Sequence, residues 1–269
     1  MRTRITSRQH PVVRRVRALA SGRVRDACLL DGAHLLYEAL DAGLSFELVA
    51  VAPRAIAREG RALEEALRLS ASTGVPAFEL PDEVADGLTS RGQTSGVFAV
   101  AAPPRFDLER ALAPPDTWVV VACDVQEPGN VGAIVRVAAA AGATAVVTTG
   151  ASADVWSWKA LRGSMGSTLR LPTTKIGDWP ETLTLCRHHG LRVVLADPRG
   201  PTPMDDARFA GRLALWVGGE GRGFPPALLA AADDTVRIPM DARVTSLNVA
   251  TATAVLAFEI RRQRRAPRV

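Results

Sequence analysis

Three short segments in the second half of the chain carry residue types that could bind a ligand and act on it. They are Asn-Val-Gly-Ala-Ile-Val-Arg at residues 130–136, Gly-Gly-Glu-Gly-Arg-Gly at 218–223, and Ile-Pro-Met at 238–240 followed by Ser-Leu-Asn-Val at 246–249. Glycine lets a backbone approach a ligand closely and adopt positive φ angles. Asn, Arg, Glu and Ser side chains supply hydrogen-bond donors, acceptors and charge beside such a backbone. Their order and spacing together indicate a folded ligand pocket.

Each segment, taken alone, also has an ordinary structural interpretation. A glycine-rich hexapeptide is most often a surface turn, and the Ile-Pro-Met segment could be an edge strand with a tolerated proline. Ser246 would be a simple N-cap for the last helix, with Asn248 in its first turn. Asn130 would cap the helix 131–141, on which Arg136 would be exposed. The presence of all three segments in this order favours a functional site over these separate interpretations.

The apolar pattern around the segments predicts an α/β domain of the doubly wound type. Strands are predicted at residues 118–123, 145–149, 192–196, 213–217 and 236–238, and helices at 131–141, 181–189, 226–231 and 247–265. Continuously apolar strands are typical of a parallel sheet covered on both faces. Ligands of such sheets bind at the carboxyl ends of the strands. Turns that could serve there follow four of the strands, at residues 124–129, 149–150, 218–223 and 240–245.

The first part of the chain predicts a smaller α/β unit. A basic helix is expected at residues 5–20, with Ser7 as its N-cap and arginines covering one face. Further strands are predicted at residues 27–30, 47–51, 75–79 and 96–101, and helices at 34–42 and 56–70. Two Pro-Pro pairs, each a strong breaker, mark a linker. We therefore divide the chain into a first domain at residues 1–102, including a basic extension at 1–22, a linker at 103–116, and a second domain at 117–269.

Composition narrows the classes of protein. The chain has 269 residues, 47% hydrophobic residues, and no apolar run as long as the roughly 18–20 residues of a membrane span. The basic start of the chain has no apolar signal region. The cysteines Cys28, Cys123 and Cys186 have no CxxC spacing and are expected to be buried reduced thiols. The histidines form no ligand pattern, so we predict no metal. These features favour a cytoplasmic protein that is not attached to a membrane.

The net charge of +5 comes almost entirely from arginine, since Lys159 and Lys175 are the only lysines. Arginine binds phosphates bidentately and stacks on bases, which favours a nucleic-acid partner. A general arginine bias of the source genome would explain the composition equally well. The clustering of arginines at residues 14–25 and 261–265 favours function. No G-x-G-x-x-G follows the first strand of the second domain, and neither lysine belongs to a P-loop, which disfavours a dinucleotide dehydrogenase or a P-loop kinase.

With these motifs in place, the chain resembles the SpoU (TrmH-like) family of RNA 2′-O-ribose methyltransferases, of the SPOUT class. The family pattern N-x-G-A-I-x-R, G-x-E-G-x-G, I-P-M and S-L-N-V matches the segments quoted above, and the resemblance is close over residues 117–265. It extends more loosely to residues 5–11 and 91–97. The resemblance implies a carboxyl-terminal trefoil knot that binds S-adenosylmethionine, a homodimer, and an amino-terminal, ribosomal-protein-like domain that binds RNA.

The resemblance also assigns roles to residues. Arg136 would act on the ribose hydroxyl, either as a general base or, because a guanidinium is normally protonated, by orienting a phosphate and stabilising the developing alkoxide. The other predicted catalytic residues are Asn130, Glu220, Ser246 and Asn248. Backbone groups would hold the cofactor at Thr149, Gly150, Gly218, Ile238, Met240 and Leu247. RNA would be bound by Arg14, Arg15, Arg17 and Arg91.

Several functions are compatible with these residues. We expect methylation of 23S ribosomal RNA, with transfer RNA as the alternative substrate. A narrower resemblance is to thiostrepton-resistance methyltransferases, and a housekeeping enzyme is the competing role. A non-catalytic RNA-binding protein that keeps the fold is disfavoured by the intact motif residues. A small-molecule enzyme on a Rossmann fold is disfavoured by the missing fingerprint.

Overall fold

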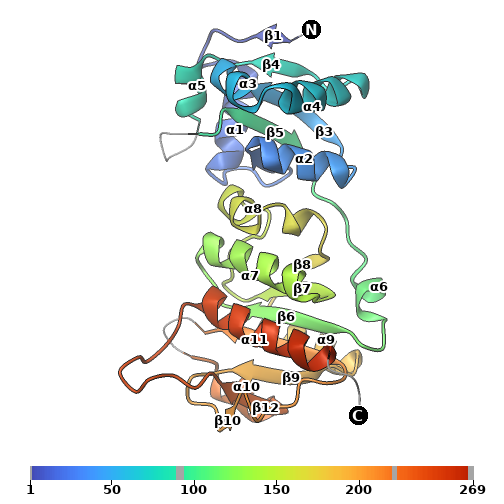
Figure 1. Ribbon diagram of the computed structural model, residues 1–269, viewed down its shortest axis with the longest axis vertical. Helices are drawn as coiled ribbons and strands as arrows, with labels where there is room; N and C mark the ends of the chain where they lie inside the picture. The colour runs from blue at the N-terminus through green and yellow to red at the C-terminus, as the bar shows by residue number, and fades with distance from the viewer. Residues whose placement is uncertain (1, 89–93, 220–222, 266–269) are drawn as a thin grey trace. The chain divides into compact units, whose positions relative to one another are not determined.

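A computed structural model describes residues 2–88, 94–219 and 223–265 of the chain (Figure 1). Glu220 and Arg91, two of the predicted site residues, lie outside these ranges. The chain forms two compact units. Unit 1 comprises Met1–Arg105 together with Trp156–Arg170, and unit 2 comprises Phe106–Val155 together with Leu171–Val269. A short segment from the middle of the predicted second domain thus packs as part of unit 1.

Unit 1 is a five-stranded mixed sheet with helices on both faces. Its strands are β1 (Thr3–Arg4), β2 (Cys28–Asp31), β3 (Phe46–Val51), β4 (Ala77–Glu79) and β5 (Val97–Ala101), in the order β1-β4-β3-β5-β2. Strand β5 is antiparallel to both neighbours, and the other pairs are parallel. The helices are α1 (Pro11–Ala20), α2 (Ala33–Asp41), α3 (Pro53–Glu59), α4 (Arg61–Ser72), α5 (Asp82–Asp86) and α8 (Trp158–Ser164), followed by the 3-10 turn η1 (Ser167–Leu169).

Two of the helices in unit 1 differ from the predicted ones. The basic helix begins at Pro11 because proline is favoured at the first helical position, and the ring of His10 accepts from the Val12 N–H at 3.3 Å. Ser7 is therefore not its N-cap. The single helix predicted at residues 56–70 is two helices, α3 and α4. Gly60, with a φ of 61°, separates them.

Helix α8 is held to unit 1 by both apolar and polar contacts. Trp158 packs in one core cluster and Leu161 in another. Asp31, at the end of β2, accepts from Trp158 Nε1 at 3.2 Å and from Arg162 Nη1 at 3.1 Å, and Ser95 Oγ donates to it at 2.6 Å. The Asp31 carboxylate is buried, and these partners satisfy the requirement that a buried charge be hydrogen-bonded.

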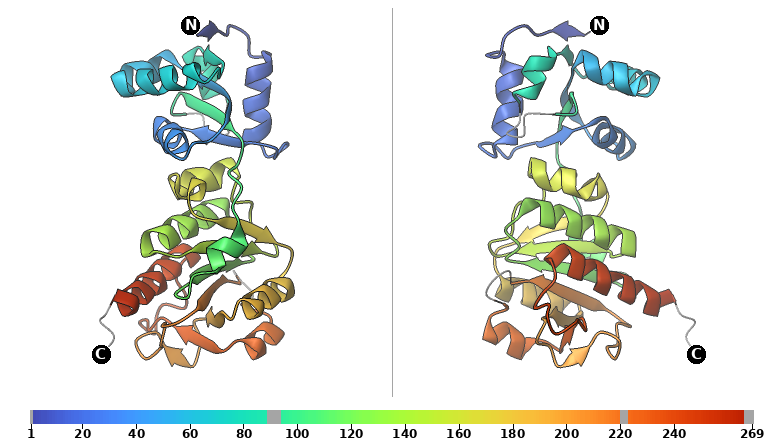
Figure 2. Two further views of the ribbon diagram at one scale, coloured as in Figure 1. Left: turned by 90° about the vertical axis from the view of Figure 1, so that its right-hand side faces the viewer. Right: turned by 60° about the vertical axis from the view of Figure 1, so that its left-hand side comes forward.

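Unit 2 is a seven-stranded parallel sheet with helices on both faces, which confirms the α/β prediction. Its strands are β6 (Trp118–Cys123), β7 (Ala145–Thr149), β8 (Thr173–Ile176), β9 (Arg192–Ala196), β10 (Thr202–Pro203), β11 (Leu213–Gly218) and β12 (Asp234–Arg237). They are ordered β10-β12-β9-β11-β6-β7-β8. The helices are α6 (Leu108–Leu112), α7 (Pro128–Ala141), α9 (Trp179–His188), α10 (Pro226–Ala231) and α11 (Val249–Arg265). Figure 2 shows α7 and α11 on one side of the sheet, with α9 and α10 on the other.

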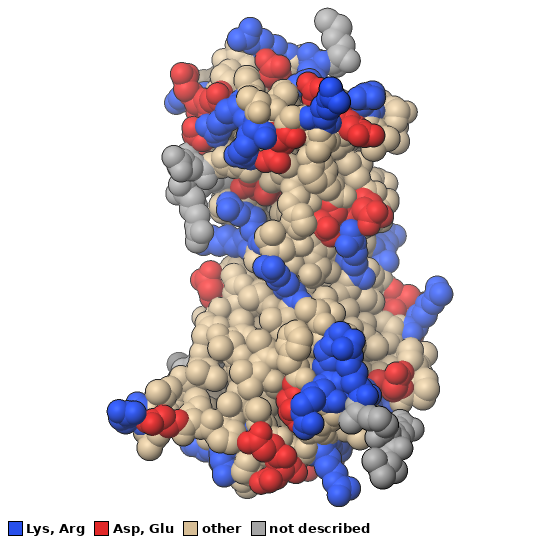
Figure 3. Space-filling view, in the orientation of Figure 1, with Lys and Arg blue, Asp and Glu red and all other residues tan. Residues whose placement is uncertain are grey.

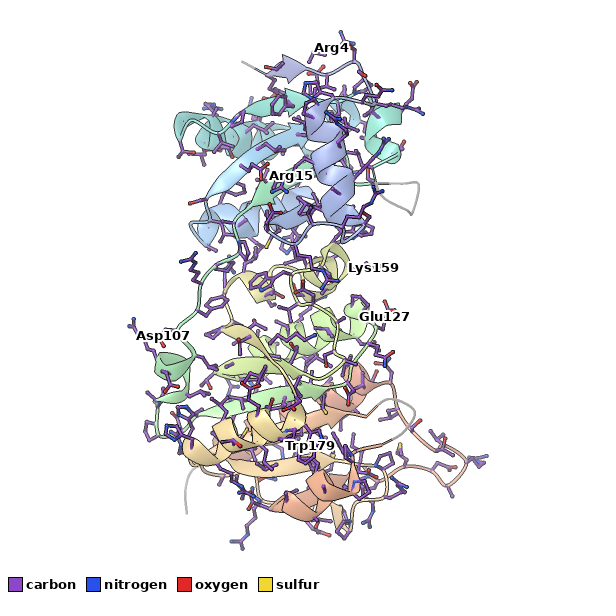
Figure 4. All side chains as sticks on the ribbon, turned by 180° about the vertical axis from the view of Figure 1, so that it is seen from behind. Arg4, Arg15, Asp107, Glu127, Lys159 and Trp179 are labelled. Atoms are coloured by element: carbon purple, nitrogen blue, oxygen red, sulfur yellow. The ribbon has the colours of Figure 1, made fainter. Side chains whose placement is uncertain are left out.

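The first turns of α7 and α11 do not use the caps of the ordinary structural interpretation. Glu127 precedes α7 and its carboxylate accepts from the Gly129 N–H, so Asn130 lies inside the helix (Figure 4). Asn248 Oδ1 accepts from the backbone N–H groups of Ala250 and Thr251, at 2.9 and 3.3 Å. Asn248 therefore performs the capping that the simple interpretation gives to Ser246.

The core of unit 2 is formed by the strands themselves, which are buried along β6, β7 and most of β11. Cys123 and Cys186 lie in this core, and Cys28 in that of unit 1; all three are buried and none is in a disulfide, as predicted. Burial raises the pKa of both the Cys123 and the Cys186 thiols to about 12. No described helix is long and apolar enough to cross a membrane. In the same residues, no group of His, Cys, Asp and Glu side chains is placed to hold a metal ion.

Candidate functional site

A cavity of about 560 Å³ lies in unit 2, where the ends of β9, β11 and β12 meet the residues before α11. This volume is within the range of small-molecule sites in proteins. Its lining is mainly apolar. The apolar lining residues include Val217, Phe224, Val236, Ile238, Leu247 and Leu256. The site therefore lies at the carboxyl edge of the parallel sheet, as the general rule for such folds predicts.

Most of the predicted cofactor residues line this cavity. Gly218, Ile238, Met240 and Leu247 are all in its wall, although they come from three separate segments of the chain. Two predicted catalytic residues line it as well, namely Ser246 and Asn248. The structure thus brings the second and third sequence segments together around one space.

The first segment is joined to the others by a hydrogen bond. Asn248 Nδ2 donates to Asn130 Oδ1 at 3.1 Å, which links the start of α11 to the first turn of α7. The two predicted catalytic asparagines, 118 residues apart in sequence, are therefore neighbours. Arg136 lies two turns further along α7 with an exposed side chain. Within the described residues its guanidinium has no hydrogen-bond or ion-pair partner.

The structure does not bring Thr149 and Gly150 to the cavity, because neither is in its lining. Their backbone groups are used at the end of β7. The Asp124 N–H donates to Thr149 O at 3.3 Å, and the Gly150 N–H donates to Gly177 O at 3.2 Å. A Cβ atom on Gly150 would lie 2.3 Å from Asp124 Oδ1, so the glycine leaves room for that carboxylate.

The carboxylate that Gly150 accommodates belongs to a residue that the sequence analysis did not select. Asp124 follows β6 with a φ of 54°, a left-handed conformation that non-glycine residues rarely adopt. Its Oδ1 accepts from the Ala151 N–H at 2.8 Å. Asp124 and Gly150 therefore fix each other at the ends of two adjacent strands. The position of Asp124 immediately after a buried strand was the available sequence signal.

Two further residues that were not selected line the cavity directly. Asp197 and Arg199 form the turn after β9, and the Asp197 side chain is only 6% exposed. Asp197 Oδ1 accepts from the Arg199 backbone N–H at 2.8 Å and from Arg199 Nε at 3.4 Å. The cavity wall thus contains a buried carboxylate beside a guanidinium, in addition to Ser246 and Asn248.

Comparison with known proteins agrees with this geometry. Residues 117–258 match the model of the SpoU rRNA Methylase family. The chain belongs to this family. The resemblance seen in the three sequence segments is therefore confirmed. Residues 2–113 match a second model, described as the amino terminus of thiostrepton-resistance methylase.

Relatives of this SpoU-family chain cover almost its whole length. An uncharacterized tRNA/rRNA methyltransferase of Synechocystis is 33% identical over 262 residues, covering 96% of this chain and 93% of the relative. A crystal structure of an RNA 2′-O ribose methyltransferase is 31% identical, with a TM-score of 0.82, covering 97% of this chain and 99% of the other. An AdoMet-bound rRNA methyltransferase from Sinorhizobium meliloti is 26% identical, with a TM-score of 0.84 and 97% coverage of both chains.

The predicted RNA-binding arginines of α1 have different surroundings within unit 1. Arg15 binds Glu47 through Nε and Nη2, at 3.0 and 2.7 Å, and Asp26 through Nη1 at 2.8 Å (Figure 4). These hydrogen bonds, above all those that Arg15 donates to Glu47, raise the pKa of Arg15, and the bond that Arg15 donates to Asp26 lowers the pKa of Asp26. Arg17 Nε donates to Gly87 O at 3.2 Å. Arg14 is exposed and has no such partner among the described residues.

The pairing of Arg15 is part of a wider pattern in unit 1. Figure 3 shows arginines lying next to acidic side chains over this unit. Arg54, for example, binds Asp86, and Arg170 binds Glu38 and Asp41. Many arginines of this basic chain are therefore neutralised by neighbours, and a surface that attracts phosphate must be sought among the unpaired ones.

Proposed function

We propose that this chain transfers the methyl group of S-adenosylmethionine to a ribose 2′-hydroxyl of RNA, with 23S ribosomal RNA as the substrate. The observation that carries the proposal is that two of the motif segments line one cavity, and that the third is joined to it by the Asn130–Asn248 hydrogen bond. The cavity combines an apolar lining with polar side chains and is large enough for a nucleoside. The proposed RNA substrate places the activity in the cytoplasm.

The cavity fits an adenosyl cofactor by the chemistry of its lining. A purine needs flat apolar contacts and backbone groups at its edge, which Ile238, Leu247 and the glycines at 218 and 219 provide. When bound, S-adenosylmethionine supplies an activated methyl group on a sulfonium. The residues around it must then exclude water and hold the accepting oxygen in line with that methyl.

Arg136 is the proposed residue for the accepting hydroxyl. Its guanidinium is unpaired among the described residues, so it is available for a substrate phosphate or for the oxygen that becomes an alkoxide. A cationic donor aimed at a developing negative charge stabilises the transition state more than the ground state. Asn130 and Asn248, fixed to each other at 3.1 Å, would orient the ribose. Ser246 completes the proposed substrate end of the site, and Glu220, which lies outside the described residues, keeps the catalytic role that the family resemblance implies.

We further propose that the functional form is a homodimer with a trefoil knot in unit 2. The support for a second subunit comes from α11, where Phe258 is 50% exposed although it is large and apolar. Some of the small residues of the same helix make contacts within this chain, since Ala257 is buried and Ala252 lines the cavity. A partner would therefore contact the remaining face of α11, around Phe258.

An activity assay tests the proposal. The protein is incubated with S-adenosylmethionine labelled in its methyl group and with rRNA or tRNA, and the labelled nucleotide is mapped by nuclease digestion. Label in a 2′-O-methylated nucleotide of 23S rRNA is the expected result. Label in tRNA alone would show that transfer RNA, and not 23S rRNA, is the substrate. Binding of RNA without transfer would favour the non-catalytic alternative, and transfer only to small molecules would favour a small-molecule enzyme.

Arg14 is expected to contribute one phosphate contact, because it is the α1 arginine whose side chain has no partner among the described residues of unit 1. Arg14→Ala should flatten the slope of log affinity against log salt by roughly 0.7–0.9, the contribution of one neutralised phosphate. The triple replacement of Arg14, Arg15 and Arg17 should flatten it by up to about 2–3. Filter binding of rRNA fragments across a salt series measures both slopes.

The control is Arg68→Ala, which removes an equally exposed arginine from α4. Because Arg15 holds Glu47 and Asp26, thermal stability and oligomeric state must be measured for the triple variant as well. An unchanged slope for Arg14→Ala, or an equal change for Arg68→Ala, would place the RNA-binding surface elsewhere.

A further inference from the structure

The buried carboxylate of Asp197 has one oxygen committed to the protein and one facing available space. Oδ1 accepts from the Arg199 N–H and Nε. Oδ2 accepts from no described residue, and a Cβ atom added to Gly223 would lie 3.9 Å from it. Because the residue lines the cavity, Oδ2 is placed to meet a bound molecule.

A carboxylate oxygen in the wall of a cavity can accept a hydrogen bond from a bound molecule. The backbone of Asp197 is held by the fold, since its own N–H donates to Val236 O at 3.0 Å and the Gly200 N–H donates to its carbonyl at 2.9 Å. The carboxylate is thus fixed in position before any ligand binds, which favours a recognition role.

We propose that Asp197 is a specificity-determining residue that accepts hydrogen bonds from the ribose hydroxyls of the adenosyl cofactor. This inference rests on the proposed function, because it assigns a contact within the same cavity. A carboxylate that accepts from a ribose hydroxyl is a recurring solution in nucleotide sites of other α/β folds. Here it is supplied by the turn after β9, in a cavity that the Leu247 segment also lines.

The charge balance around Asp197 favours neutral hydroxyl donors over the cofactor's ammonium group. Arg199 Nε lies 3.4 Å from Asp197 Oδ1, and its Nη2 lies against Gly223 on the same wall. The carboxylate therefore already has a cationic neighbour and does not require a second positive charge. A vicinal diol offers O–H donors without adding charge, which suits a partly neutralised acceptor.

The test uses calorimetry with the full chain and a set of related ligands. Asp197→Asn keeps the shape and the Oδ1 acceptor but replaces the free carboxylate with an amide. Its dissociation constant for S-adenosylhomocysteine should rise about tenfold or more, as expected for a hydrogen bond to a charged group. 5′-Methylthioadenosine, which lacks the amino-acid end, should show the same factor. The 2′-deoxy and 3′-deoxy forms of 5′-methylthioadenosine should bind native and variant proteins more nearly alike.

Two controls separate recognition from folding. Asp206→Asn changes an exposed acid of unit 2 and should leave every dissociation constant unchanged. Arg199→Ala removes the cationic neighbour but keeps Asp197, so it should still discriminate ribose from deoxyribose ligands. Thermal denaturation of each variant confirms that unit 2 is folded.

The outcomes are distinct. Equal affinity of native protein and Asp197→Asn for S-adenosylhomocysteine would overturn the inference while leaving the proposed function intact. If Asp197→Asn weakens binding of S-adenosylhomocysteine but not of 5′-methylthioadenosine, then Asp197 contacts the amino-acid end of the cofactor. That result would also overturn the inference. If the native protein binds none of these ligands, the proposed function itself fails and the inference fails with it.

Discussion

Replacing Arg136 by alanine is expected to lower the rate of methyl transfer by about a thousandfold, the upper range for loss of one transition-state donor. Cofactor affinity should change little, because Arg136 is not part of the cavity wall. Stability should also change little, since the side chain is exposed and makes no hydrogen bond or ion pair with a described residue. Single-turnover kinetics with labelled cofactor and calorimetry with S-adenosylhomocysteine measure the two effects separately.

Arg136→Lys provides the sharper comparison. An ammonium keeps the charge but cannot reproduce the planar, bidentate geometry of a guanidinium, so this variant should fail nearly as completely. Arg208→Ala, which removes another exposed arginine of unit 2, is the matched control and should retain full turnover. Substantial turnover by Arg136→Ala would contradict the catalytic role, whatever its effect on RNA affinity.

Much of unit 2 could be predicted from sequence because its strands are continuously apolar. The bounds of β6, β7 and β9 agree residue for residue with the predicted strands, and α10 agrees as well. Short or polar elements were not predicted. Strand β8 reads Thr-Thr-Lys-Ile and β10 has only two residues, so neither carries the apolar run that marks a strand.

The sequence predicted those cavity residues that belong to a motif. It did not predict residues whose position depends on tertiary packing. Ile238, Met240 and Leu247 line the cavity as expected. Asp197 was overlooked although it follows a predicted strand, because its turn contains neither a glycine-rich motif nor a family pattern. Helix α8 shows the same limit: its place in unit 1 depends on Asp31 and Trp158, 127 residues apart, and no local pattern predicts that pairing.

Gly218 is required for a different reason in the structure than the sequence motif suggests. The sequence predicts that a side chain there would obstruct the cofactor. In the structure, Gly218 has a φ of 131°, and a Cβ atom would lie 1.9 Å from the carbonyl oxygen of Cys123 on the neighbouring strand β6. Backbone cannot yield as a flexible side chain does. The glycine is therefore required first by the pairing of β11 with β6, and only through it by the ligand.

Gly218→Ala is accordingly expected to lower the free energy of unfolding of unit 2 by about 3–5 kcal/mol, the range of severe single substitutions. Gly218→Val should be worse still. Gly211→Ala is the matched control: it too has a positive φ, 77°, but nothing lies within 4 Å of its added Cβ. It should cost only about 1 kcal/mol, the conformational penalty alone. Chemical denaturation followed by tryptophan fluorescence, with Trp216 on β11 as a reporter, compares the two variants.

The difference between the two glycines decides between the structural and the ligand-contact role of Gly218. Equal losses of stability for both variants would mean that β11 and β6 accommodate the added methyl group. The short distance to the Cys123 carbonyl would then not explain the need for glycine. A stable Gly218→Ala protein that no longer binds S-adenosylhomocysteine would restore the direct ligand contact that the sequence predicts. If stability and binding fall together, the carbonyl of Cys123 sets the requirement, because the shift that relieves the collision also moves the wall of the cavity.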